Sequence, residues 1–500
     1  MRHEKLFSVL VIACLLTGIA KLAFAEDPAT SAQTAPPQHM FGTIAIEGEI
    51  RTRVEGWNWF YQNDRTRYAF GETLLQLALS QHRKNFSWKI ELAQPTLIGL
   101  PEDALFPGTQ VPLGLGGVYF SANNSHRNVA SLFLKQGYVF FTGLAGNGGT
   151  LQLGRFDFAE GLEGRANDAS LAWLKRERIA QRLIGDSYWT AAGRSFDGIH
   201  FSEDLGARNN VTFVAARPTK GVYQLDGMGE VDVNLLYASY TRELPTRKTA
   251  SEVRVFGVGY FDSRNVLKVD NRPLAVREAD THSIRIGTFG MDYVLLFPIH
   301  DLGRWDFLVW TAGQTGNWGV LHHHAGAVTA EAGWQPPTKW LLKWLRPWLR
   351  AGALSTSADG NPNDAKHTTF FQMLPTDRQY ARLLFYTMQN VEDYTGQLIL
   401  RPSEKLWLRS ELHKVKLHGR NDLWYQGSGA FQNTSFGYEG LPAKAQGGLA
   451  DFVDLSVDYR PTKGLGFTAY VGALSGKATM TNLLRGRKAG MAYLEFSYHF

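Results

Sequence analysis

Four arginines in the first half of the chain lie among carboxylates and have the chemistry of an anion site. They are Arg155, Arg178, Arg182 and Arg194, with Asp157 and Asp197 beside them. Guanidinium groups stay charged at physiological pH and bind carboxylates through two parallel hydrogen bonds. In a narrow passage these arginines would select anions, while the acids would hold them in place and limit how tightly an anion binds. The same pairs can instead brace the protein, and the sequence leaves both interpretations open.

Two further sets of basic residues extend this hypothesis. Arg378 and Arg382 flank Tyr380, and Arg51 and Arg53 lie near the start of a predicted strand. Sugar rings stack on aromatic faces while arginine binds a carboxylate, so this mixture suits an acidic saccharide. A later group of aromatic residues would either contact sugar or pack a loop. It comprises Trp424, Tyr425, Phe431, Phe436 and Tyr438.

Other chemistry has weaker support in the sequence. One segment resembles the opening of a calcium loop through Asp359, Asn361, Asn363 and Asp364. The twelfth position of such a loop should be Glu but is Phe370, which excludes an EF-hand. A looser Ca²⁺ site remains as a weak candidate. No Ser-His-Asp or paired-carboxylate motif stands at a recognisable spacing. We therefore expect neither an enzyme nor a cofactor.

In the segments that carry these residues, apolar and charged side chains alternate with a period of two residues. Ile44, Ile46, Ile50 and Val54 alternate with charged residues that include Arg51 and Arg53. Such alternation is typical of a strand with one face toward lipid and the other toward a lumen. Because a basic group at the lipid midplane costs about 2–4 kcal/mol, the charged face is predicted to point inward.

Similar short runs continue to the end of the sequence, where Leu494, Phe496, Tyr498 and Phe500 alternate with polar residues. Together they predict an all-β, antiparallel outer-membrane barrel of 16–18 strands, about 18, including one strand at 382–390. Long connections are expected at 95–130, 159–195, 357–381 and 417–448, outside the cell or folded into the lumen. Gly154 and Gly193 each precede an arginine and predict either a β-bulge or a close backbone approach, which would direct those arginines inward.

The N-terminal region predicts export. Residues 1–25 have a basic start, an apolar stretch and the small-x-small sequence Ala23-Phe24-Ala25, which is typical of a signal peptide. The sole cysteine, Cys14, lies within it, so disulfides are not expected. Residues 26–41 contain prolines and show no periodicity, and predict a disordered periplasmic lead before a barrel over 42–500.

Two segments resemble the bacterial alginate-export family. They are LGRFDFAEGLEG at 153–164 and LKRERIAQRLIGDSYWTAAGRSFDGIHF at 174–201, reinforced by residues 361–383 and 421–440. The resemblance extends over most of residues 42–500. It implies an outer-membrane barrel of 18 strands that passes an anionic uronate polymer through an electropositive constriction.

We therefore predict a channel in the bacterial outer membrane for an acidic saccharide such as an alginate-like uronate. The alternative within transport is a general or anion-preferring diffusion porin for small organic anions, and an outer-membrane barrel enzyme has less support. The expected partners are membrane lipid, the anion and, if the direction is export, a periplasmic secretion scaffold. A nucleic-acid partner is not expected, and the net charge of +6 is too small to identify a partner.

Overall fold

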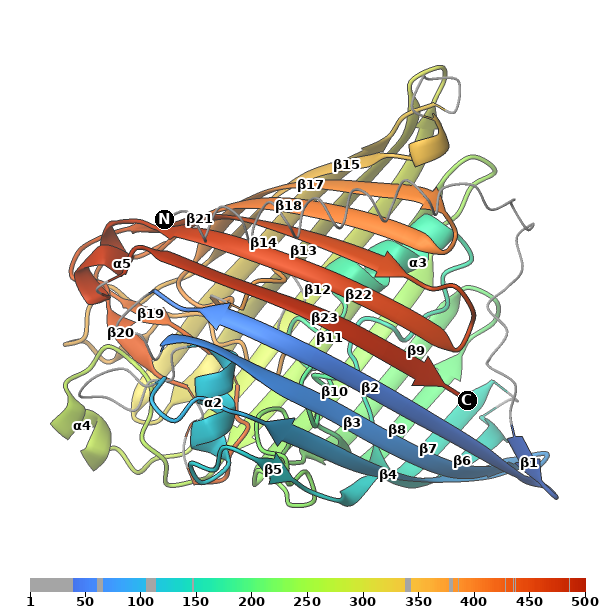
Figure 1. The fold of residues 1–500 in the computed structure, drawn as a ribbon, viewed down its shortest axis with the longest axis horizontal. Coiled ribbons are helices and arrows are strands. Elements are labelled where there is room, and N and C mark those ends of the chain that lie inside the picture. Colours follow the sequence, from blue (N-terminus) through green and yellow to red (C-terminus); the bar gives the residue numbers. More distant parts are fainter. Residues whose placement is uncertain are drawn as a thin grey trace.

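The computed structural model describes residues 39–60, 66–104, 114–145, 148–337, 343–376, 381–384, 386–427, 429–434, 436, 438–484 and 486–500. Within these ranges, 18 antiparallel strands form a barrel (Figure 1). The barrel closes because β2 (Ile44–Asn58) pairs with both β3 (Arg67–His82) and β23 (Lys488–His499). The predicted fold class is confirmed.

The other barrel strands follow one another around the wall in chain order. They are β4 (Phe86–Ile98), β6 (Phe133–Leu144), β7 (Gly149–Phe156), β8 (Phe196–Asp204), β9 (Asn209–Pro218), β10 (Val233–Glu243), β11 (Ala250–Asp262), β12 (Ile284–Ile299), β13 (Gly303–Trp318), β14 (Leu321–Gln335), β15 (Trp348–Thr356), β17 (Glu392–Ser403), β18 (Leu406–Lys416), β21 (Gly448–Tyr459) and β22 (Leu465–Gly476).

Shorter elements complete the described part. Three short strands join the same sheet, namely β1 (His39–Phe41), β5 (Val129–Ala130) and β16 (Lys366–His367), while β19 (Leu423–Tyr425) and β20 (Gly440–Pro442) pair with each other. The helices are α2 (Leu115–Ala122), α3 (Ala169–Leu174), the π-helical η2 (Lys175–Ile179), α4 (Leu274–Ala279), the 3-10 helix η3 (Lys343–Leu345) and α5 (Ala478–Leu483). In the described ranges, none of the helices combines the length and the apolarity required to cross a membrane.

The predicted alternation is present in β2. Val54 is 59% exposed on the outer face, whereas its neighbour Arg53 is 1% exposed and points inward. At the end of the chain, Leu494 on β23 is 69% exposed. The barrel therefore directs apolar side chains outward and charged ones into its interior, as lipid on one side and a polar lumen on the other require.

Two boundaries differ from the sequence prediction. The described residues of 382–390 form no strand, because they belong to a connection whose residues 386–391 are all buried. A segment that is buried on both faces does not separate lipid from lumen. Its apolar side chains pack against other parts of the protein, and for that reason the segment was wrongly predicted as a strand. In the predicted lead, residues 39–41 form β1 and pair with β2. The remainder of the lead and the predicted signal peptide lie outside the described residues.

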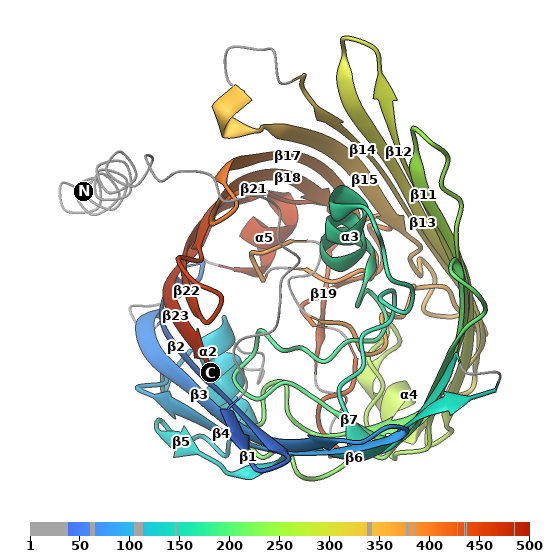
Figure 2. The same cartoon turned by 90° about the vertical axis from the view of Figure 1, so that its right-hand side faces the viewer.

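The two ends of the barrel differ in the length of their connections. One end has short turns such as 205–208, 404–405 and 460–464, whereas the four long connections predicted from sequence all lie at the other end. Outer-membrane barrels have short periplasmic turns and longer extracellular loops, which orients this one. Figure 2 shows α3 and its connecting segments inside the ring of strands.

Two of the long connections meet in the interior. The amide of Leu374 donates to the carbonyl of Leu183 at 2.9 Å, and the amide of Gly185 donates to the carbonyl of Leu374 at 2.8 Å. The connection 157–195 also reaches the periplasmic half, where Asp168 pairs with Arg304 on β13 at 2.7 Å. A loop that begins at the extracellular end thus extends deep into the lumen.

Candidate functional site

Arg51 and Arg53 on β2 hold the loop 157–195 against the barrel wall. Arg51 donates to the carbonyl of Thr190 at 2.7 Å, and Arg53 donates to the carbonyl of Trp189 at 3.0 Å while lying 4.3 Å from the centre of the Trp189 ring. Arg53 also donates to Glu495 on β23 at 2.8 Å. Both arginines therefore face the interior as predicted, but they are already bound to protein groups.

Arg155 and Asp197 form a pair across two barrel strands. They are register partners on β7 and β8, and the guanidinium binds both carboxylate oxygens, at 2.7 and 2.6 Å. Gly154, which precedes Arg155, has φ +124°, and a side chain there would collide with the carbonyl of Gly137. Close backbone approach at Gly154 is confirmed.

Asp157 and Arg194 both contact a lysine, Lys135, that no charge cluster in the sequence indicated. Lys135 on β6 lies 3.2 Å from Asp157 and donates to the backbone carbonyl of Arg194 at 2.9 Å. The buried side chain of Arg194 is 2% exposed. Residues 155, 157, 194 and 197 therefore lie near one another where β7 and β8 meet the connection 157–195, although they divide into separate contacts.

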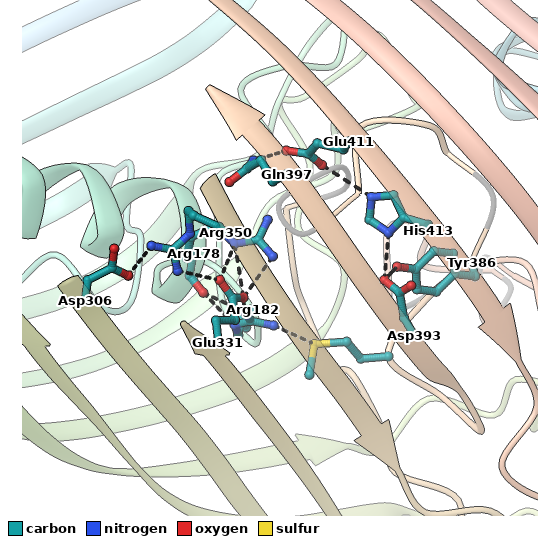
Figure 3. Close-up of polar contacts among 11 residues, drawn as sticks. Arg178, Arg182, Asp306, Glu331, Arg350, Tyr386, Asp393, Gln397, Glu411 and His413 are labelled. Carbon is teal, nitrogen blue, oxygen red and sulfur yellow. Dashed lines mark hydrogen bonds and ion pairs between the residues drawn. The ribbon is translucent and has the colours of Figure 1, made fainter. Parts of the chain in front are cut away.

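Arg178 and Arg182 lie in the interior segment and converge on one carboxylate of the wall (Figure 3). Glu331 on β14 accepts from Arg178 at 2.8 Å and from Arg350 on β15 at 2.9 Å, and it lies 3.6 Å from Arg182. Arg182 additionally donates to the backbone carbonyl of Arg178 at 2.6 Å. Glu331 therefore joins the interior segment to the barrel.

The predicted set of Arg378, Tyr380 and Arg382 lies partly outside the described residues, because Arg378 and Tyr380 belong to the range 377–380. Arg382 is described and lies 3.8 Å from Asp458 on β21. Arg409 on β18 joins this group, at 3.7 Å from Asp458 and 2.9 Å from Glu177 of η2. Burial acts to raise the pKa of Glu177, but Arg409, Arg176 and Arg382 outweigh it and lower this pKa to about 2.

This group borders a cavity of about 240 Å³ inside the barrel. Among the described residues, its charged lining contains four arginines and four carboxylates, with aromatic rings beside them. These are Arg178, Arg382, Arg409 and Arg460, then Glu177, Glu411, Asp458 and Glu495, and the rings of Trp173, Trp189 and Tyr493. The positive and negative groups are equal in number, but their side chains differ in how far they are exposed to solvent. Arg460, in a periplasmic turn, is exposed, whereas Arg409 and Asp458 are 12% and 19% exposed.

The predicted calcium loop is a self-bonded turn. Asp359 accepts from the amide of Asn361 at 3.1 Å, Asn361 accepts from the amide of Asn363 at 3.2 Å, and Asp364 accepts from the amide of Lys366 at 2.9 Å. The described residues bring no third carboxylate or imidazole to this turn as part of a metal-binding group. Calcium binding here stays a prediction.

The aromatic residues of the 417–448 connection pack in the interior. All five have exposed fractions of 8% or less. Phe436 lies against Trp318 of β13 at 5.4 Å between ring centres, and Tyr425 lies 6.4 Å from Tyr438. Of the two alternatives for these residues, the structure supports loop packing.

Sequence reasoning missed the inward-facing charges on the more distant strands. Arg254 on β11 binds Asp292 on β12 at 2.6 Å and also pairs with Glu160 of the interior segment. Lys175 of η2 pairs with Glu252 at 2.7 Å. Charged residues at inward positions of β11 and β12 were the available signal, but the sequence could not indicate which partner each of them meets.

A closed barrel with a polar interior, long loops folded inward and a charged cavity defines an outer-membrane channel of the porin type. The alginate export family matches residues 117–467. Because this match covers more than half of the sequence, the chain belongs to the alginate export family.

Solved structures agree with the fold. The barrel is similar to OccK9 (OpdG) of Pseudomonas aeruginosa, with a TM-score of 0.53, 10% identity, and coverage of 91% of this chain and 98% of that one. OccAB3 of Acinetobacter baumannii gives a TM-score of 0.53, 10% identity, and coverage of 91% and 99%. OpdK of Pseudomonas aeruginosa, solved with vanillate, gives 0.52, 8% identity, and coverage of 91% and 98%. A search of curated protein sequences found no match.

Proposed function

We propose that this channel passes an acidic saccharide of the alginate-like uronate class. The observation that carries the proposal is the interior cavity, where Arg460 is exposed beside Arg382 and Arg409 and the rings of Trp189 and Tyr493 lie in the same lining. Arginine binds a carboxylate while an aromatic face stacks on a sugar ring, so the two kinds of group together suit a uronate residue. Membership of the alginate export family supports the same substrate class.

The paired arginines have a second part in this proposal. Arg382 and Arg409 are held near Asp458 and Glu177, so an entering carboxylate competes with these acids. Such competition weakens binding enough to let the anion leave, which conduction requires. In this proposal Arg51, Arg53, Arg178 and Arg182 hold the interior loop in place, and Arg178 also lines the cavity. Arg155 instead joins β7 to β8. The proposal assigns the protein no reaction.

A small organic anion is the second candidate substrate. The cavity of about 240 Å³ has room for a single ring rather than for several linked sugars, and OpdK, which shares the barrel fold, was solved with vanillate. Passage of a polymer would proceed residue by residue through the same space. In either case we propose that residues 1–25 direct export, and a periplasmic scaffold is expected as a partner only if the polymer is secreted.

Block of single-channel current distinguishes the candidates. Oligouronates are added to the barrel in a planar bilayer and compared with neutral oligosaccharides of equal length and with a small aromatic carboxylate. We expect oligouronates to block strongly, neutral sugars weakly, and Arg460→Gln to lower uronate affinity several-fold. Arg208→Gln is the matched control, because Arg208 is also exposed in a short periplasmic turn but does not line the cavity. Equal block by neutral and acidic sugars would refute the saccharide assignment.

A further inference from the structure

Three buried side chains on neighbouring strands form a group with the chemistry of metal ligands. Glu411 and His413 lie on β18, and Asp454 on β21 is the register partner of Glu411. Their exposed fractions are 5%, 4% and 1%. One ligand-capable atom from each of the three lies within 4.8 Å of the other two. One imidazole nitrogen and two carboxylate oxygens make a ligand set known for divalent first-row metals.

The imidazole of His413 is held in the orientation that ligation needs. Its Nδ1 lies 2.8 Å from a carboxylate oxygen of Asp393 on β17, and Tyr386 donates to the same oxygen (Figure 3). Phe452 stacks on the ring at 4.2 Å with an interplanar angle of 10°. Metal-binding histidines commonly donate their second nitrogen to a carboxylate, which leaves the other nitrogen as the ligand. Here that nitrogen is Nε2, 3.3 Å from Glu411.

The charges of the group also favour a cation. Three buried carboxylates, Asp393, Glu411 and Asp454, surround one imidazole. Within the described part of the chain, the ion pairs of Asp393 and Glu411 are both with His413. Burying carboxylates is costly unless cations compensate them. Arg178 and Arg382 act electrostatically on Glu411 in addition to the imidazole, and a divalent metal would add two positive charges between the carboxylates.

We propose that His413 Nε2, Glu411 and Asp454 bind a divalent first-row cation such as Mn²⁺, Co²⁺ or Zn²⁺, with Asp393 as a positioning residue. Metal–ligand distances of about 2.0–2.2 Å place tetrahedral ligand atoms roughly 3.3–3.6 Å apart, so ligand atoms now separated by up to 4.8 Å must move closer by side-chain rotation when the metal binds. Glu411 also lines the interior cavity, which gives the ion a route of entry from the lumen. The site is independent of whether the channel carries uronates.

The test uses the full-length purified barrel after treatment with a chelator. Co²⁺ is titrated and followed by visible absorption, and Mn²⁺ and Zn²⁺ are titrated by calorimetry. We expect one site per chain. His413→Gln and Asp454→Asn should each weaken binding by more than tenfold, and Asp393→Asn by about 10–100-fold through loss of the orienting contact. His324→Gln, an exposed histidine on β14, is the matched control and should bind as the wild type does.

Crystals of the wild-type protein soaked in Mn²⁺ provide a measurement that does not depend on variants folding. An anomalous difference peak between His413, Glu411 and Asp454 is expected. Absence of a peak there, or binding that is equally strong in His413→Gln and in the wild type, would overturn the proposal and leave His413 as an imidazolium paired with two carboxylates.

Discussion

Replacing Glu331 by Gln is expected to release the interior loop from the barrel wall. Glu331 is 4% exposed and binds Arg178 through contacts of 2.8–3.1 Å and Arg350 at 2.9 Å. Gln keeps the shape but removes the charge, so two buried guanidinium groups lose a shared counter-ion. Breaking a buried pair by removal of one partner costs about 3–5 kcal/mol. Because Asp306 also binds Arg350, that guanidinium keeps one counter-ion, and we expect a loss of stability near the lower end of this range.

The assay is urea unfolding of the barrel in detergent, followed by tryptophan fluorescence, with single-channel recording in parallel. Glu331→Gln should lower the free energy of unfolding by about 3 kcal/mol and increase open-channel noise as residues 157–195 loosen. Glu404→Gln is the matched control, since the Glu404–Arg346 pair is 69% and 39% exposed and is worth at most about 1 kcal/mol. Equal losses in the two variants would refute the view that Glu331 anchors the loop.

Three other perturbations have expected outcomes. The pKa of Glu177 falls from 4.5 to about 2 on folding, so its stabilisation is present above pH 4.5 and is lost as the pH falls toward 2; Glu177→Gln should flatten the pH dependence of unfolding in that interval. Arg182→Glu with Arg194→Glu should lower the melting temperature, because both side chains are at most 2% exposed, and unchanged melting would place them in open solvent. Leu494→Arg puts a charge on the outer face and should cost about 2–4 kcal/mol at the bilayer midplane, measured by refolding into lipid vesicles.

The barrel was predictable because lipid imposes a simple rule on side chains. Outward positions must be apolar, so Val54 and Leu494 indicate the outer face and Arg53 the inner face without any knowledge of partners. The long connections were predictable for the same reason, since they interrupt the alternation. This rule does not apply inside the lumen. Residues 386–391 are buried there by other segments of the protein, so their sequence resembles that of a strand although they form none.

The candidate site was less accessible to sequence reasoning. The described arginines of the predicted set lie inside the barrel, and their role toward an anion stays a prediction. The sequence could not assign Glu331 to Arg178, because these residues lie 153 positions apart and meet only when the loop folds inward. Arg460 and Arg409 were missed, since each stands alone in the sequence. The charge of a residue and its position in the alternating pattern identify which side chains face the lumen. The chemistry of the cavity depends on which of these side chains stay accessible after they form ion pairs, and the sequence does not show this.

Reversal potential in a KCl gradient across a planar bilayer tests the central claim most directly. We expect an anion-selective wild-type channel and a loss or inversion of that selectivity in Arg460→Glu. Arg208→Glu should leave the selectivity unchanged, because Arg208 is exposed in a periplasmic turn and does not line the cavity. A cation-selective wild type, or equal selectivity in the wild type and Arg460→Glu, would contradict an arginine-dependent path for acidic saccharides.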